Sequence, residues 1–216
     1  MKIFILLLFT CFAFGQTKEY TFDYYTIYDV KWPDSTSFKK LYLTHTQNPN
    51  YMMYVKLNND FTIKRMEIYD RDINQFYRFK YPENVILKNV AAINEFIESY
   101  QINPVDWKVI KNKKNRYFKT KKVSLDDYTH IELVFYKNKK KTKIDHTIYL
   151  ETQRHPTIKN QFYASGLNFF YYNLALNSIE TDQFITKVYR TDNEQMSAEE
   201  NLIQIKPIQL KISLDQ

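Results

Sequence analysis

The four histidines are the residues of this chain best suited to metal binding or proton transfer, because imidazole titrates near neutral pH and is a common metal ligand. They are His45, His130, His146 and His155. A zinc site needs three or four ligands within about 2.0–2.3 Å of the metal. Neither H-x-H nor H-E-x-x-H spacing occurs, so we expect no metal site and interpret these histidines as core or surface residues.

The alternation around two of these histidines predicts different environments for them. His130 shares a strand face with Glu132, whereas His146 shares a face with Ile148 and Leu150. Because alternate residues of a strand lie on the same face, His146 is expected on the more apolar side of a hairpin. His130 is expected on the more polar side.

No catalytic group can be assembled from the remaining polar residues. Acid–base catalysis by paired carboxylates needs one pKa raised by burial, but Asp70 with Asp72 and Asp126 with Asp127 both flank turns. Ser165-Gly166 lacks the G-x-S-x-G pattern of a nucleophile elbow. We therefore predict no catalytic residue and a protein that is not an enzyme.

Glycine is nearly absent from the chain. Gly15 and Gly166 are the two glycines, and a phosphate loop or a dinucleotide fingerprint needs several. No cofactor is expected. The tight turns must use Asn and Asp, which tolerate left-handed backbone; residues 48–50, residues 58–60 and Asn138 fit this role.

The first residues are typical of a secretory signal peptide. Lys2 precedes an apolar run over residues 3–14, and Ala13-Phe14-Gly15 supplies small residues for cleavage before Gln16. Residues 1–15 are thus expected to be removed, leaving residues 16–216 as one exported β-rich domain in the periplasm, at the outer-membrane periphery or outside the cell. The run is shorter than the roughly 20 residues of a membrane span, and no later segment approaches that length.

Cysteine chemistry is expected to leave with the signal peptide. Cys11 is the single cysteine, so residues 16–216 have no disulfide and no thiolate site. A lipid anchor at Cys11 is the alternative, but Thr10 is a poor match to the small residue that bacterial lipidation needs at that position.

Positive charge is concentrated in one part of a chain of net charge +7. Residues 107–143 hold thirteen Lys and Arg against three acids. A surface of this kind attracts anions, and in an exported protein these are lipid headgroups, acidic polysaccharides or acidic proteins rather than nucleic acid. The alternative is a set of solvated lysines that keep sheet edges soluble. The candidate anion-binding residues are Lys113, Lys114, Arg116, Lys119, Lys121, Lys122, Lys139, Lys140, Lys141 and Lys143.

Alternating apolar residues predict a largely antiparallel sheet. Short runs between residues 18 and 81, separated by Asn, Asp and Pro turns, indicate a meander. Residues 129–136 and 143–151 indicate a hairpin joined by a basic loop. Further strands are expected at residues 107–110, 116–118, 184–189 and 208–214, while residues 167–176 fit either a helix or a buried strand.

Two helices are expected beside the sheet. Ile93, Phe96, Ile97 and Tyr100 follow helical spacing, which predicts a helix over residues 91–101. Ser197-Ala198-Glu199-Glu200 is a capping box, which predicts a short helix over residues 198–204. The fold class is thus mainly β: an antiparallel curved sheet, half-barrel or barrel-like, with one or two packed helices.

Aromatic residues on both faces of several strands leave two interpretations open. A sheet with one wet face would be polar on that face, whereas Tyr24 with Tyr25 and Phe76 with Tyr77 put aromatic rings on both. Either one face of a curved sheet lines a concavity able to hold an apolar ligand, or an ordinary two-layer core carries tyrosines at its surface.

The chain resembles secreted β-rich proteins of unknown role from the Bacteroidota. Phe14-Gly15-Gln16, the Tyr-, Lys- and Asn-rich early strands and Ser165-Gly166-Leu167 carry the resemblance. It is similar to the family named for a Gly-Leu-Pro-Gly-Leu-Ile motif but departs from the motif after Gly166-Leu167. Its strand pattern also resembles that of the outer-membrane lipoprotein carrier, a half-barrel that binds acyl chains, which implies a lipid-binding fold.

Two functional hypotheses follow. The first is a non-enzymatic envelope protein that holds an apolar or lipid ligand in its curved sheet. The second is an envelope interaction protein that contacts an anionic partner or polysaccharide through residues 107–143, without a ligand cavity.

Overall fold

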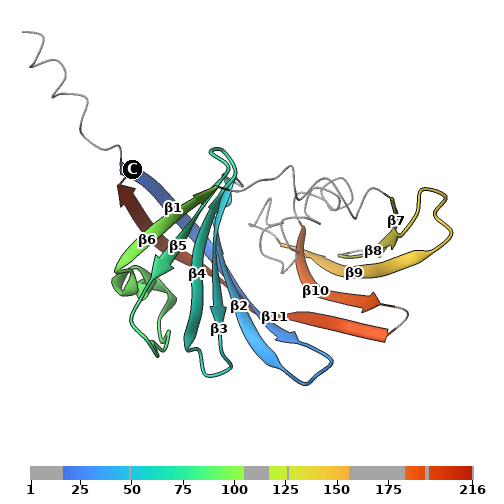
Figure 1. The fold of residues 1–216 in the computed structure, drawn as a ribbon, viewed down its shortest axis with the longest axis horizontal. Coiled ribbons are helices and arrows are strands. Elements are labelled where there is room, and N and C mark those ends of the chain that lie inside the picture. Colours follow the sequence, from blue (N-terminus) through green and yellow to red (C-terminus); the bar gives the residue numbers. More distant parts are fainter. Residues whose placement is uncertain are drawn as a thin grey trace, which may run out of the picture.

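The described residues form one curved antiparallel sheet that does not close (Figure 1). The computed structural model describes residues 17–48, 50–104, 117–125, 127–155, 183–192 and 195–215. The strand order across the sheet is β6-β5-β4-β3-β2-β1-β11-β10-β9-β8-β7. The strands are β1 (Thr17–Lys31), β2 (Ser37–Thr44), β3 (Tyr51–Leu57), β4 (Ile63–Asp70), β5 (Gln75–Lys80), β6 (Ser99–Pro104), β7 (Phe118–Leu125), β8 (Tyr128–Tyr136), β9 (Ile144–Arg154), β10 (Gln183–Asp192) and β11 (Gln195–Asp215).

Two long strands hold the sheet together. β1 and β11 pair from Thr17↔Asp215 to Lys31↔Glu199, with register shifts between Phe22 and Tyr24 and between Ile27 and Tyr28. Each shift acts as a bulge and changes which face the following side chains occupy. The two strands therefore supply apolar side chains to both faces.

The first core lies on one face, here called the first face. It contains the inward residues of β1 to β5, among them Leu41, Met53 and Ile68, and the end of β11. A 3-10 helix, η1 (Val90–Phe96), packs Ile93 into it. Tyr20 on β1 and Tyr77 on β5 have ring centroids 5.8 Å apart although three strands lie between them, so the sheet curls around this core.

The second core lies on the opposite face, here called the second face. Strand register places Tyr42 and Met52 there, because they alternate with the first-core residues of the same strands. The same face of β8 to β10 supplies Ile131, Leu133 and Val188. Apolar side chains on both faces are thus buried in cores.

Most strand predictions are confirmed. The meander between residues 18 and 81 is β1 to β5, the hairpin is β8 and β9, and residues 184–189 and 208–214 lie in β10 and β11. Residues 1–15, 107–110 and 167–176, with Lys113, Lys114 and Arg116, lie outside the described residues. Phe118 begins β7, so the strand expected at residues 116–118 is seen only from there on.

The helix predicted over residues 91–101 is wrong in its second half. Asn89 caps η1 by accepting a hydrogen bond of 3.0 Å from the Ala91 backbone N–H. The chain is then extended, and β6 pairs with β5 from Lys80↔Ser99 onward. Pairing with β6 satisfies backbone N–H and C=O groups along β5 that would lack this partner strand if the helix continued. This gain outweighs the local preference that the helical spacing expresses.

The helix predicted over residues 198–204 is wrong throughout. Those residues belong to β11, where Glu200 pairs with Val30 of β1 and Val188 of β10. A capping box expresses a local preference, which strand pairing on both sides overrides. β11 also contains a proline, Pro207, which cannot donate a backbone hydrogen bond. The strand accommodates it because the described pairing of β10 with β11 ends at Asn201, and proline is tolerated where one side of a strand is unpaired.

Candidate functional site

A row of tyrosines crosses the second face of β1 to β4. Tyr28 and Tyr42 have ring centroids 6.0 Å apart at 76°, and Tyr42 and Tyr54 have centroids 5.4 Å apart at 36°. Tyr69 on β4 continues the row beside Met52, its cross-strand partner. The row exists because alternation places one tyrosine from each strand on the same face.

The row continues into an aliphatic wall from strands on the other side of β11. Ile131 pairs with Leu150, and Leu133 pairs with Ile148. All four side chains are buried and belong to the same cluster as the tyrosine row. The second face therefore combines an aromatic part and an aliphatic part in one apolar surface.

A hydrogen bond ties the two parts together. The Tyr28 hydroxyl on β1 donates to the Ile185 carbonyl on β10 over 2.7 Å, and both groups are buried. Since β11 lies between these strands, the tyrosine side chain reaches over a whole strand. The second face is therefore concave along β1, β11 and β10.

A buried ion pair lies beside the tyrosine row. The Lys40 ammonium contacts Oε1 of Glu200, and both side chains are largely buried. Oε2 of Glu200 is buried and has no hydrogen-bond partner among the residues that the structure describes. The pair thus places one satisfied and one unsatisfied carboxylate oxygen in a mainly apolar surface.

A second carboxylate lies at the far end of the row and is fully satisfied. Oε1 of Glu67 accepts hydrogen bonds from Nε of Arg65 at 2.7 Å and Nε of Arg78 at 2.8 Å. Its Oε2 accepts one of 2.6 Å from the Tyr69 hydroxyl. Charge-assisted bonds of this kind fix side-chain orientation, so Glu67 anchors the β4 end of the row.

Burial raises the pKa of the tyrosine hydroxyls of the row further above neutral pH. Burial raises the pKa of Tyr28 and of Tyr42 well above the usual value, and the nearby charge of Glu200 adds to it. Burial raises the pKa of Tyr54 to about 12, although Arg65 partly opposes this. At neutral pH these groups act as hydrogen-bond donors and acceptors and not as anions.

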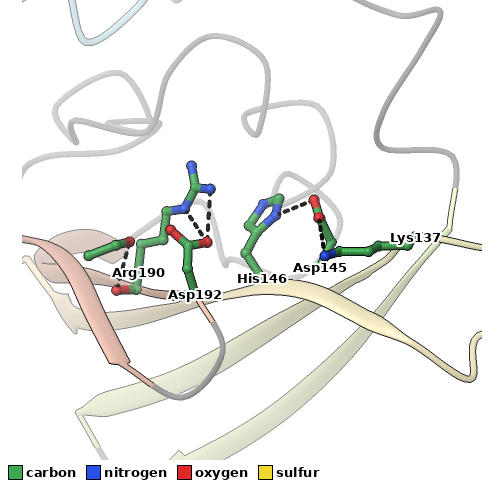
Figure 2. Close-up of polar contacts among 6 residues, drawn as sticks. Lys137, Asp145, His146, Arg190 and Asp192 are labelled. Atoms are coloured by element: carbon green, nitrogen blue, oxygen red, sulfur yellow. Dashed lines mark hydrogen bonds and ion pairs between the residues drawn. The ribbon is translucent and has the colours of Figure 1, made fainter.

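His146 lies at the hairpin end of the second face (Figure 2). Its ring stacks on Phe135 with centroids 4.5 Å apart at 11°, and its Nδ1 lies 3.0 Å from the Asp145 carboxylate. Asp145 lies 3.8 Å from the Lys137 ammonium. The apolar position predicted for His146 is confirmed. Burial lowers the pKa of His146, and its hydrogen bond to the Asp145 carboxylate opposes this shift.

A second ion pair stands beside this histidine. Nη2 and Nε of Arg190 donate to one Asp192 oxygen over 2.9 and 3.1 Å, and Figure 2 shows the pair pointing to the same side as His146. Burial raises the pKa of Asp192, but the Arg190 hydrogen bonds outweigh it, and the pKa is lowered. His146, Asp145, Arg190 and Asp192 together form a partly buried polar cluster at the border of the second core.

No metal site is assembled in the described ranges. No three His, Cys, Asp or Glu side chains there converge as metal ligands. His130 is exposed. Asp70 is buried and accepts a hydrogen bond of 2.6 Å from the Tyr20 hydroxyl. Asp126 and Ser165 lie outside the description.

The structure brings the described basic residues together at one edge of the sheet. β7 is an edge strand and pairs with β8, so Lys119 lies near the tip of the β8–β9 hairpin, and Lys121 and Lys122 lie farther along the same edge. Lys141 donates a hydrogen bond of 2.9 Å to the Phe118 carbonyl and has a structural role. The exposed candidates at this edge are Lys119, Lys121, Lys122, Lys139, Lys140 and Lys143.

A shallow hollow of about 190 Å³ lies on the first face of the C-terminal strands. Lys121, His130 and Glu132 line it together with Tyr149 and Tyr189, whose rings stack with centroids 4.5 Å apart. The lining is half polar and opens outward. It is therefore not the apolar concavity considered from the sequence.

Sequence reasoning missed Lys40, Glu200 and the tyrosine row as a site. The tyrosines alternate visibly, but their convergence depends on pairing between strands that are distant in the chain. Glu200 was assigned to a helix, which hid its place on a sheet face. The signal in the sequence that could have located Glu200 is its place as an acidic residue at an inward position of an alternating apolar run.

Comparisons with known proteins add a distant likeness. No family model and no curated protein sequence matches the chain. Among solved structures, the chain is similar to a LolA superfamily protein from Nitrosomonas europaea, with 8% identity and a TM-score of 0.31 over 86% of this chain and 85% of that one. A TM-score of 0.31 supports no statement about the fold or the function of this chain. Nothing supports the Gly-Leu-Pro-Gly-Leu-Ile family.

Helices in the described part of the chain are short. None reaches the length and hydropathy that crossing a bilayer requires.

Proposed function

We propose that this protein is a non-enzymatic binding protein of the cell envelope that holds an apolar or lipid ligand against the second face of its sheet. The observation that carries the proposal is the continuous apolar cluster, buried in this structure, that joins the tyrosine row to the aliphatic wall. Ligand sites in proteins are mostly apolar concave surfaces with a few placed polar groups. Lys40, Glu200 and His146 are such groups here.

Ligand entry requires an exchange of contacts. Leu133 and Phe135 are buried in this structure, so a ligand must replace the contacts that bury them. Burying an acyl chain instead gains about 0.8 kcal/mol per methylene, which offsets the loss of those contacts. Export to the envelope rests on the signal sequence expected at residues 1–15.

The first experiment is native mass spectrometry of the purified protein, with lipid extraction of the same sample. A stoichiometric lipid would support the proposal. Binding is then measured with the apolar fluorophore N-phenyl-1-naphthylamine in two matched variants, Leu133→Ala in the second core and Leu41→Ala in the first, both of which replace fully buried leucines. Each should lose about 2–5 kcal/mol of stability.

The two variants should differ in binding. Leu133→Ala should weaken fluorophore binding about tenfold, because part of the apolar contact is removed. Leu41→Ala should leave the affinity within about twofold of the wild type, since its side chain lies on the other face. A clean ligand-free mass together with no fluorophore binding would refute the proposal.

The second candidate is an interaction with an anionic surface, supported by the gathering of exposed lysines along β7 and the hairpin tip. The variant K139E/K140E/K143E should lose binding to vesicles containing phosphatidylglycerol. The matched control K64E/K80E/K88E reverses three exposed lysines of the N-terminal strands and their loop. Equal loss in both variants would indicate general charge attraction and no dedicated site.

A further inference from the structure

One of the two carboxylate oxygens of Glu200 has no hydrogen-bond donor among the described residues. The side chain lies on the second face, and the residue is 8% exposed. Oε1 contacts the Lys40 ammonium. Oε2 is buried without a hydrogen-bond partner among the described residues.

An oxygen in this state is costly and uncommon. Leaving a buried acceptor unsatisfied costs about 1–3 kcal/mol, and more for a charged group. The Tyr28 hydroxyl, which lies near enough to feel the charge of Glu200, donates instead to the Ile185 carbonyl. Glu67, the other buried glutamate on this face among the residues that the structure describes, has donors on both oxygens. Glu200 therefore lacks the second donor that Glu67 has, and a hydrogen-bond donor from outside the chain could supply it.

The neighbouring sheet face provides a contrast at the next residue. Glu199 points to the first face and forms an ion pair of 2.8 Å with Lys187. Its carboxylate is also hydrogen-bonded by the Asn201 side chain and is partly exposed. The unsatisfied acceptor is thus confined to the apolar second face.

The charge balance fixes the kind of donor. The Lys40 ammonium already compensates the Glu200 carboxylate, so the missing partner needs a hydrogen to donate but no positive charge. A second carboxylate, such as that of a free fatty acid, would be repelled by Glu200. A hydroxyl or an amide N–H meets both conditions.

We propose that Oε2 of Glu200 accepts a hydrogen bond from a neutral hydroxyl or amide N–H at the polar end of an apolar ligand bound to the second face. This inference rests on the proposed function and narrows its ligand class. An acyl chain with a neutral, donor-bearing head group fits, and the same chain without a donor does not.

The test compares three ligands with the same acyl chain on the purified protein: monoolein, with free hydroxyls, methyl oleate, without a donor, and oleate, an anion. Affinities are measured by displacement of N-phenyl-1-naphthylamine. Monoolein should bind about tenfold or more tightly than methyl oleate and oleate, because a hydrogen bond to a buried charged group discriminates by at least that factor.

Two adjacent variants locate the effect. Glu200→Gln should abolish the preference for monoolein, since the amide oxygen stays with Lys40 and an N–H₂ group replaces the acceptor. Glu199→Gln, one residue away on the other face, should retain it. Near-ultraviolet circular dichroism and Tm of both variants show whether each is folded, and the comparison of ligands on the wild type does not depend on either variant.

The outcomes separate the two proposals. Equal affinity of the wild type for monoolein and methyl oleate would overturn this inference and leave the proposed function standing. Loss of the preference in Glu199→Gln as well as in Glu200→Gln would also overturn it. Binding of none of the three ligands would overturn the proposed function and this inference with it.

Discussion

The hydroxyl of Tyr28 on β1 hydrogen-bonds the carbonyl of Ile185 on β10 over 2.7 Å, with β11 lying between the two strands. Both groups are buried. A flat sheet would hold strands separated by one neighbour about 9.5 Å apart, so this contact records the curvature of the second face. It also fixes the angle between the tyrosine row and the aliphatic wall.

Replacing Tyr28 by Phe should therefore destabilise the protein. The ring remains, but the Ile185 carbonyl loses its hydroxyl donor, which costs about 1–3 kcal/mol. Urea unfolding followed by circular dichroism measures the change. Tyr128→Phe is the control, because Tyr128 is 51% exposed, and it should stay within about 0.5 kcal/mol of the wild type. Equal stability of the two variants would contradict the role given to Tyr28.

The fold was largely predictable because its strands carry local signals. The alternation in β3 and β9 and the turn residues between strands are visible in the sequence, and both strands form where expected. The errors fall at Ser99–Pro104 and at the start of β11, where a helical pattern competes with pairing to a distant strand. Such pairing has no local signature, since its free energy comes from the partner strand.

A buried carboxylate stabilises the first core. Asp70 on β4 accepts a hydrogen bond of 2.6 Å from Tyr20 on β1 and pairs with the Lys18 ammonium at 2.6 Å. Its other oxygen accepts a hydrogen bond of 2.9 Å from the Asp72 backbone N–H. Every acceptor position of this carboxylate therefore faces a donor.

Asp70→Asn should lower the free energy of unfolding by about 3 kcal/mol, because the new N–H₂ group faces donors and the ion pair is lost. Thermal and urea unfolding measure the loss. Asp72→Asn provides the control at an exposed carboxylate in the same turn. A loss below about 1 kcal/mol in Asp70→Asn would show that the network adds little to stability.

The candidate site was predictable only in part. The basic residues of β7 and the hairpin were named as anion-binding candidates, and pairing brings the described ones to one edge. Their binding role stays a prediction. The apolar face given to His146 was also correct. Glu200 and Lys40 could not be recognised together, because residues 160 positions apart meet only through the β1–β11 and β1–β2 pairings.

The scarcity of glycine leaves strain in turns. Ser35, in the turn between β1 and β2, has φ 65°, and Lys141 in the β8–β9 hairpin has φ 53°. Residues 48, 50, 58–60 and 138, expected from the sequence to take this conformation, have no positive φ. Asn74 and Asn84 do, and Phe61 takes the left-handed conformation directly after the turn at residues 58–60. A left-handed residue with a Cβ costs about 1–2 kcal/mol.

Ser35→Gly should accordingly raise the free energy of unfolding by about 0.5–1 kcal/mol, since the relief of strain exceeds the added chain entropy. Ser37→Gly is the control, because Ser37 begins β2 and glycine in a strand is destabilising. Opposite signs of the two changes in urea unfolding are expected. A stability loss in both would show that the Ser35 turn is unstrained.

His146 should make stability depend on pH. Burial lowers its pKa below the 6.5 of an unfolded chain; Asp145 opposes the shift and Arg190 adds to it. The folded protein thus takes up this proton less readily than the unfolded chain. The stabilisation is complete above about pH 6.5 and decreases as the pH falls toward the folded pKa, with a slope of at most about 1.4 kcal/mol per pH unit.

The free energy of unfolding of the wild type and of His146→Gln should therefore be compared at about pH 7.5 and about pH 5.5, a range in which histidines titrate. The wild type should lose more stability than His146→Gln over this interval. His130→Gln, at an exposed position, should lose as much as the wild type. Because burial also lowers the pKa of His155, some dependence should persist in His146→Gln. An identical pH dependence in all three proteins would mean that the charge of His146 is not linked to folding.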